Sequence, residues 1–218
     1  MKMDLPPDLR ARILSAAQAR PAPARDAVER ATLATLAGGL AAMALVFLAF
    51  GGADMTTRPP AFLAMTFGGW VAIAAVATWL GVARGGKMLG RNAAVLVVAA
   101  LVTGPCLIAW MLVGTTMWPG TLGYDVPLRG HLVCLGFVTT MAVGPFLALA
   151  AVRRKSDPVH PQATGLALGA VAGAWAGVMG DLHCPVSDVV HVGVGHVLPV
   201  LVFAALGALL GRRVFGVR

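Results

Sequence analysis

The sequence predicts an all-α, polytopic membrane protein built as a bundle of six transmembrane helices. Three observations carry this prediction. Hydrophobic residues make up 58% of the 218 residues and charged residues only 12%, with a mean hydropathy of +0.82. Soluble domains are about a quarter charged, so an ordinary soluble fold is excluded. The chain also contains six long apolar runs, and its basic residues are concentrated in alternate segments between them.

Each apolar run is about 20 residues long, the length that an α-helix needs to cross about 30 Å of hydrocarbon. The six predicted spans are residues 31–50, 61–83, 92–114, 131–152, 163–180 and 189–211. Residues 1–30 form a basic tail ahead of the six-helix domain of residues 31–218. This tail is not expected to be a signal peptide, because the first apolar run is a full span without a small-residue cleavage site.

The positive charges predict the orientation. When the segments between spans are assigned alternately, 15 of the 17 Lys and Arg residues fall on one side, and only Arg58 and Arg129 fall on the other. Since cytoplasmic segments are enriched in Lys and Arg, we expect a bacterial inner-membrane protein with both termini in the cytoplasm. The net charge of +8 then reflects topology, so no direct nucleic-acid partner is predicted.

Small residues indicate where helices pack closely. Four glycines recur at every fourth position of the fifth span and leave one face as bare backbone: Gly165, Gly169, Gly173 and Gly177. We therefore expect this helix at the centre of the bundle. Pro199 lies inside the sixth span and removes a helical hydrogen bond, so a local distortion is expected there.

Most of the reactive side chains fall on the outer side in this topology. His131 and Cys134 are three residues apart where the fourth span begins, so they share a helix face. Cys184 lies in the last outer loop, residues 181–188, before a helix for which Ser187 is the predicted N-cap. Further side chains that can bind a metal lie in or beside this loop: Asp181, His183, Asp188 and His191.

Three interpretations of these side chains remain open. A disulfide between Cys134 and Cys184 would close a loop of about 50 residues and contribute roughly 4 kcal/mol in an oxidising compartment. A transient metal ion at the two cysteines is the second interpretation, although no CxxC or HxxxH spacing is present. Its further ligands would come from His131, His183, Asp181, Asp188 and His191. In the third interpretation the thiols are unpaired and the histidines unrelated. Cys106, inside the third span, is expected to be a buried small residue.

His196 lies about two turns inside the sixth span, where an ionisable side chain is a functional candidate by default. The alternative is a neutral histidine that is hydrogen-bonded to a neighbouring helix. His191 and His196 are five residues apart, which separates them by about 140° around an α-helix. They are therefore not expected to form a metal-binding pair on a single face.

The tail contains a short amphipathic pattern. Residues 8–20 place Leu9, Ile13 and Ala16 at i, i+4 and i+7, which predicts a helix with one apolar face. Such a helix would bind a partner protein or lie on anionic membrane lipid, and its arginines suit both roles. The pair Asp26 and Glu29 has the spacing of a capping box, which predicts a helix that continues into the first span.

The overall layout, the Leu-His-Cys-Pro loop at residues 182–185 and the helix end at residues 207–213 resemble the NrsF-like anti-sigma factors. The resemblance implies a membrane protein that holds an extracytoplasmic-function sigma factor inactive at the inner face. It also implies that Cys134 and Cys184 sense metal or oxidant stress. The tail would contact the sigma factor, above all through Leu9, Arg10, Arg12, Ile13 and Leu14.

The leading hypothesis is therefore a signalling protein without enzymatic activity. The main alternative is a membrane thiol oxidoreductase, or a haem-binding electron carrier with His131, His191 or His196 as axial ligands. Against it, the sequence has no CxxC, HExxH or GxSxG motif. A transporter is disfavoured because the spans contain few charges and no matching pair of broken helices. No cofactor is predicted apart from the transient metal ion.

Overall fold

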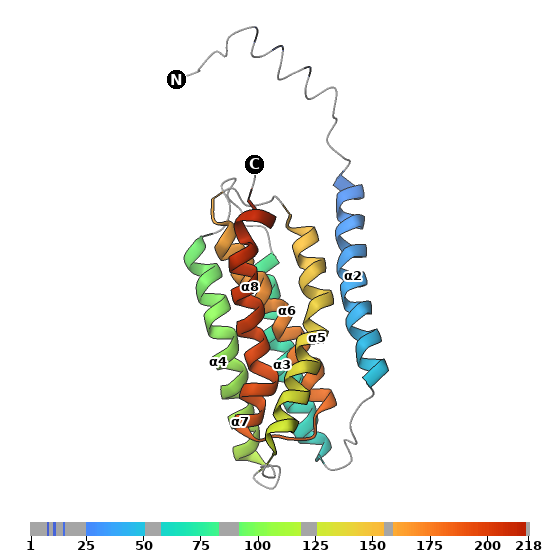
Figure 1. The fold of residues 1–218 in the computed structure, drawn as a ribbon, viewed down its shortest axis with the longest axis vertical. Helices are drawn as coiled ribbons and strands as arrows, with labels where there is room; N and C mark the ends of the chain where they lie inside the picture. The colour runs from blue at the N-terminus through green and yellow to red at the C-terminus, as the bar shows by residue number, and fades with distance from the viewer. Residues whose placement is uncertain are drawn as a thin grey trace. The chain divides into compact units, whose positions relative to one another are not determined.

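The computed structural model describes residues 25–50, 58–82, 92–118, 126–154 and 159–216, together with positions 8, 11 and 15. Across these residues the secondary structure is helical, as predicted, without strands. The elements are α2 (Arg25–Phe50), α3 (Pro60–Val82), α4 (Ala93–Met117), α5 (Leu128–Val152), α6 (Pro161–His183), α7 (Val189–Val192), the π-helical turn η3 (Gly193–Val197) and α8 (Leu198–Val214) (Figure 1). The predicted tail contacts lie outside the described residues: Leu9, Arg10, Arg12, Ile13 and Leu14.

Six helical stretches are long and apolar enough to cross a membrane, and they overlap the six predicted spans. The sixth stretch, Val189–Val214, combines α7, η3 and α8. Large apolar side chains are exposed on these helices, among them Trp79, Leu147 and Leu209. Contiguous apolar surface of this kind is rare on soluble monomers, and it suits contact with hydrocarbon.

The helix that contains the fifth predicted span runs three residues past it. The prediction ended this helix at Gly180 and placed the next residues in a loop, whereas α6 continues to His183. No proline occurs between the first turn of α6 and Pro185, and the N–H of Cys184 still donates to the carbonyl of Gly180. Asp181 and His183 therefore project from the last helical turn.

The described residues separate into two compact units between Ala34 and Thr35, inside α2. The first unit contributes the start of α2 and the three isolated positions to the description. All packing described below belongs to the second unit, from Thr35 onward.

Within the second unit, α2 approaches α5 at a pair of glycines. A Cβ on Gly39 would lie 2.5 Å from the Cβ of Ala148 and 3.1 Å from the carbonyl oxygen of Gly144. Met43, one turn further along α2, is buried in the same apolar cluster as Met141 of α5. The two helices therefore pack with their backbones in close contact.

Helix α6 is the central helix of this unit and packs against α3, α4, α5 and α8 (Figure 1). Its glycine face allows the backbone of α8 to approach, since a Cβ on Gly169 would collide with the carbonyl group of Phe203. The other three glycines of the face also lack room for a Cβ: Gly165 lies against Gly207, Gly173 against Val200, and Gly177 against Trp70. Small residues thus let α6 occupy the middle of the bundle.

The sixth span is not a continuous α-helix. Between α7 and α8 the chain makes the π-helical turn η3, in which the N–H of Leu198 donates to the carbonyl of Gly193, five residues earlier. Pro199 follows this turn and has no N–H with which to continue the α-helical pattern. The distortion expected at this proline therefore takes the form of a wider helical turn, which carries His196.

Candidate functional site

Four side chains, one from α5 and three from the segment of residues 184–196, meet where α5 begins and α6 ends. One ligand atom from each residue, the Sγ of Cys134 and Cys184 and a ring nitrogen of His191 and His196, lies within 4.8 Å of all the others. Both thiols are free, and all four residues are buried. We call these four residues the thiol–imidazole cluster.

Two sharp helix ends bring Cys184 and His191 into the cluster. Cys184 caps α6 and is followed by Pro185, which has no N–H for a further helical bond. Asp188 caps α7, because its carboxylate accepts a hydrogen bond of 2.8 Å from the N–H of His191. The N-cap is therefore Asp188, and the prediction of Ser187 was wrong by one residue.

His191 is held from two sides. Its Nε2 lies 3.1 Å from the Sγ of Cys184, and its Nδ1 lies 3.2 Å from the Nδ1 of His131 in the first turn of α5. In the hydrogen bond between the rings one Nδ1 donates and the other accepts, so the two histidines must adopt complementary tautomers. The first two turns of α5 thus contribute Cys134 to the cluster and place His131 beside it.

The prediction that His191 and His196 cannot meet on one face is wrong. Their ring centroids are 5.5 Å apart, and both rings belong to the cluster. Five residues exceed one α-helical turn by about 140°. In a π-helix, by contrast, the hydrogen bonds span five residues, so residues five apart lie close to one turn apart. The turn η3 supplies this change of rotation.

His196 is the least satisfied member of the cluster. It is 1% exposed, and neither ring nitrogen has a hydrogen-bond partner among the described residues. Its ring packs edge-on against Trp70 of α3, with the centroids 6.2 Å apart. A buried polar group without a partner costs about 1–3 kcal/mol. The fold therefore holds this imidazole in place at an energetic cost.

Cys184 lies outside the six membrane-length helices, and its neighbours change its acidity. The adjacent thiol of Cys134 has the largest effect and lowers the pKa of Cys184. Burial acts in the opposite direction, and the rings of His191 and His196 lower the pKa further. Because the thiolate is the nucleophilic and metal-binding form of cysteine, the lowered pKa favours the reactive form of Cys184.

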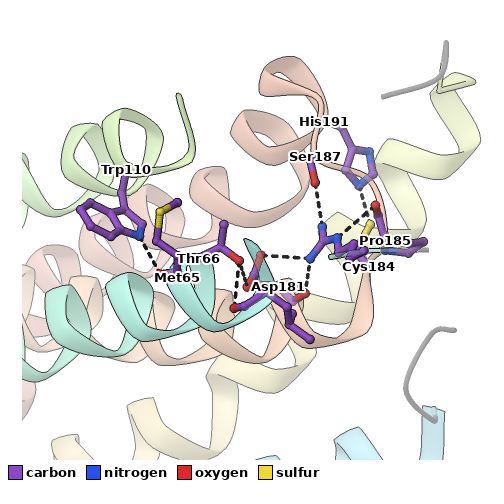
Figure 2. Close-up of polar contacts among 10 residues, drawn as sticks. Met65, Thr66, Trp110, Asp181, Cys184, Pro185, Ser187 and His191 are labelled. Carbon is purple, nitrogen blue, oxygen red and sulfur yellow. Dashed lines mark hydrogen bonds and ion pairs between the residues drawn. The ribbon is translucent and has the colours of Figure 1, made fainter. Parts of the chain in front are cut away.

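A buried ion pair fastens the loop beside the cluster (Figure 2). The Nη1 of Arg58, which precedes α3, lies 3.4 Å from the Oδ1 of Asp181 and donates to the Asp181 carbonyl at 3.1 Å. Its Nη2 donates to the hydroxyl of Ser187 at 3.0 Å, and its Nε donates to the carbonyl of Pro185 at 3.3 Å. Thr66 of α3 donates to the other carboxylate oxygen of Asp181 at 3.1 Å. Arg58 therefore ties α3 to the α6–α7 loop.

Sequence reasoning missed this role of Arg58, which it counted only as a charge on the outer side. A lone arginine directly before an apolar helix was the available signal, because a buried charge needs a partner. Cys106 was also misplaced, since it is exposed on α4 and not buried.

Three of the predicted metal-binding candidates have other contacts in the structure. Asp181 pairs with Arg58, and Asp188 caps α7. His183 stacks on Phe137 of α5, with the ring centroids 4.0 Å apart. His196 joins the two cysteines and His191 instead.

The fold and the cluster together define a multi-helix bundle of the membrane-protein type with two free, buried thiols at one end. The chain belongs to the family described as negative regulator of sigma F (NrsF), which it matches over residues 16–216. This match confirms the resemblance noted in the sequence, and it describes a regulator and not a catalysed reaction.

A relative from Azospira oryzae carries the name probable anti-sigma-F factor NrsF. It is 35% identical to this chain over 79 residues. The aligned segment covers 36% of this chain and 37% of that protein, little more than a third of its length. No solved structure matches the chain.

Proposed function

We propose that this protein is a membrane anti-sigma factor that sequesters an extracytoplasmic-function sigma factor through its N-terminal tail and releases it when its buried thiols react. The observation that carries the proposal is the meeting of Cys134 and Cys184 with two imidazoles at one end of the bundle. Membership of the negative-regulator family supports the regulatory role.

The distribution of charge supports a topology in which the signal arrives on one side and the sigma factor binds on the other. Arg153 and Arg154 follow α5, and Arg212 and Arg213 lie in the last turn of α8. These helix ends are remote from the cluster. By the positive-inside rule, the basic ends and both termini face the cytoplasm of a bacterial cell. The cluster then faces the periplasm, where thiols are oxidised.

Helix α5 supplies a route between the cluster and the tail. It carries Cys134 in its second turn and packs against α2 at Gly144, and α2 begins at Arg25, next to the tail. A shift of α5 at the thiol changes the surface against which α2 packs. Release of the sigma factor requires that the bundle has two states with different affinities for it.

Two reactions of the thiols would act as the signal. A two-electron oxidant such as peroxide or hypochlorous acid would join the two sulfurs, as both thiols lose their protons and the oxidant accepts the two electrons. A soft metal ion would instead displace the thiol protons and bind both sulfurs. Either reaction draws the start of α5 and the α6–α7 loop together.

Co-purification tests the role of the tail. The full chain and a chain without residues 1–30 are each produced with the sigma factor encoded nearest to it. We expect the full chain to retain the sigma factor and the shortened chain to lose it. The double variant Leu9→Glu and Ile13→Glu should behave like the deletion, because it removes the apolar face and keeps the arginines. Equal recovery of the sigma factor with all three chains would refute the tail assignment.

Transcription under stress tests the role of the thiols. Cys134→Ser and Cys184→Ser should each abolish induction of sigma-dependent genes by cadmium or by an oxidant. Cys106→Ser is the matched control, because Cys106 is an exposed cysteine outside the cluster. If both cluster variants respond like the unmodified protein, the sensing role is wrong.

A further inference from the structure

We propose that the thiol–imidazole cluster is a closed four-coordinate site for one divalent d¹⁰ cation, Zn²⁺ or Cd²⁺, with Cys134, Cys184, His191 and His196 as its ligands. The inference rests on the same site as the proposed function and names the ligand that this site takes.

The distances in the cluster suit such a site. With metal–sulfur bonds of about 2.3 Å and metal–nitrogen bonds of about 2.0 Å, the ligand atoms of a tetrahedron lie about 3.3–3.8 Å apart. The four ligand atoms here lie within 4.8 Å of one another, and the Sγ of Cys184 is 3.1 Å from the Nε2 of His191. Ligand pairs therefore need to close by no more than about 1.5 Å, and the Cys184–His191 pair needs to open slightly, to form the tetrahedron.

His196 provides independent support. It is 1% exposed, and both of its ring nitrogens lack a hydrogen-bond partner in the described part of the chain. Buried polar groups in folded proteins nearly always have a partner, and an exception needs an explanation. A cation bound beside the two sulfurs would satisfy one of these nitrogens.

His131 completes the surroundings of the site. When the Nε2 of His191 binds the cation, its Nδ1 carries the proton and donates to the Nδ1 of His131, 3.2 Å away. Metal-binding histidines commonly donate their second ring N–H to such an outer partner, which fixes the tautomer and orients the ring. His131 is therefore a positioning residue of the site.

Charge balance favours a divalent cation. Two thiolates and two neutral imidazoles carry two negative charges, which a divalent cation neutralises among buried side chains. The nearby charges of Arg58 and Asp181 already neutralise each other. A monovalent soft ion would leave one uncompensated buried charge, which is costly. Four protein ligands leave no open position, as in structural zinc sites and unlike hydrolytic ones.

Cadmium binding by the full-length protein tests the site. The protein is purified in detergent with an affinity tag that contains no histidine, and it is reduced with a phosphine so that no added thiol competes for the metal. We expect one Cd²⁺ per chain and a thiolate-to-cadmium charge-transfer band in the ultraviolet. X-ray absorption should report two sulfur and two nitrogen neighbours.

Histidine variants identify the nitrogen ligands. His196→Ala should weaken cadmium binding at least about tenfold, which is the smallest effect typical of losing even an outer partner. His196→Gln fills most of the space and should also lose affinity, and circular dichroism shows whether both variants remain helical. His183→Ala is the matched control, since His183 lies at the same end of the bundle but stacks on Phe137. Its affinity for Cd²⁺ should be unchanged.

Three results would each overturn the site. X-ray absorption could show only sulfur neighbours around the cadmium, both His196 variants could bind Cd²⁺ as tightly as the unmodified protein, or the protein could bind no stoichiometric Cd²⁺. These readouts do not depend on the sigma factor. Binding through two sulfurs and two nitrogens supports the site even if Cd²⁺ releases no sigma factor, a result that would count against the proposed function. Release without such binding would overturn the site and leave the proposed function standing.

Discussion

The Sγ of Cys184 and the Nε2 of His191 lie 3.1 Å apart, on opposite sides of the turn between α6 and α7. Asp188 fixes this approach, because its carboxylate caps α7 through the N–H of His191. The thiol therefore faces an imidazole within the bundle and not open solvent.

The first prediction concerns the pH dependence of Cys184. Its pKa is lowered first by Cys134 and then by His191 and His196, so the thiolate persists below the usual thiol pKa of about 8.5. We expect its alkylation rate in metal-free, reduced protein to change little from about pH 9 to about pH 7. In an unfolded chain with a thiol pKa of about 8.5, the rate falls about 25-fold over the same range. Mass spectrometry of peptides labelled by a small reagent measures both rates.

The lowered pKa of Cys184 also makes the free energy of unfolding depend on pH. A folded pKa below the unfolded one stabilises the fold above the unfolded pKa, and this contribution is lost as the pH falls through the folded pKa.

Cys134→Ala removes the largest cause of the shift, so the alkylation rate of Cys184 should then fall with pH as in an ordinary thiol. A fall of about 25-fold between pH 9 and pH 7 already in the unmodified protein would contradict the prediction.

The second prediction concerns the π-helical turn. A Cβ on Gly195 would lie 3.0 Å from the Cβ of Cys134 and 3.7 Å from the Nε2 of His191. Gly195→Ala must therefore push α5 away, and we expect it to lower the free energy of unfolding by about 1 kcal/mol and to weaken cadmium binding. Gly193→Ala is the control in the same turn, because nothing lies within 4 Å of its added Cβ. If Gly195→Ala and Gly193→Ala change the free energy of unfolding and the affinity for Cd²⁺ equally, this account is wrong.

The third prediction concerns the ion pair of Arg58 and Asp181. Arg58→Ala leaves a buried carboxylate without its partner, so we expect a loss of about 3–5 kcal/mol in the free energy of unfolding. Alkylation of Cys184 should also become faster, because the guanidinium no longer holds the carbonyl of Pro185 and the hydroxyl of Ser187.

Arg129→Ala is the matched control for this change, since Arg129 is an exposed arginine at the start of α5. Its effect should stay within about 0.5 kcal/mol. Replacing both Arg58 and Asp181 by apolar residues of similar size should restore much of the lost stability, because no charge is then left alone. Equal losses for the double variant and Arg58→Ala would show that the ion pair is not the cause.

The fourth prediction concerns the contact between α6 and α8. Gly169→Ala directs a Cβ at the backbone of Phe203, which cannot move aside like a flexible side chain. We expect a loss of about 1–3 kcal/mol, measured as unfolding in mixed detergent. Gly68→Ala in α3 meets nothing within 4 Å and should be neutral or slightly stabilising. If both variants unfold alike, close backbone packing does not hold these helices together.

The helices could be predicted because their length and composition follow from the thickness of hydrocarbon and from the rise per residue. Their ends depend on individual contacts. The fifth span continues past Gly180 to His183, and Asp181 in this extra turn is held by Arg58 from a segment more than a hundred residues away. Hydropathy contains no information about such a partner.

The candidate site was predictable where it depended on topology and unpredictable where it depended on helix geometry. Alternate crossing of the membrane places Cys134 and Cys184 at the same end of the bundle. His131 lies three residues before Cys134, so it shares a helix face with that cysteine. The pairing of His196 with His191 was not predicted, because a regular α-helix places the two residues on different faces, whereas η3 supplies a wider turn. A glycine on each side of Val194, followed by Pro199, was the local signal for this irregular turn.

Helix α5 has a mechanical property that follows from where its residues lie. Cys134 and Gly144 are ten residues apart, about 15 Å along the helix axis. A small tilt of the helix at the thiol would displace Gly144 sideways, where α2 packs. Pro145 comes next and interrupts the hydrogen bonding of the helix. The helix is therefore most easily bent between Met141 and Pro145, next to the residue at which it contacts α2.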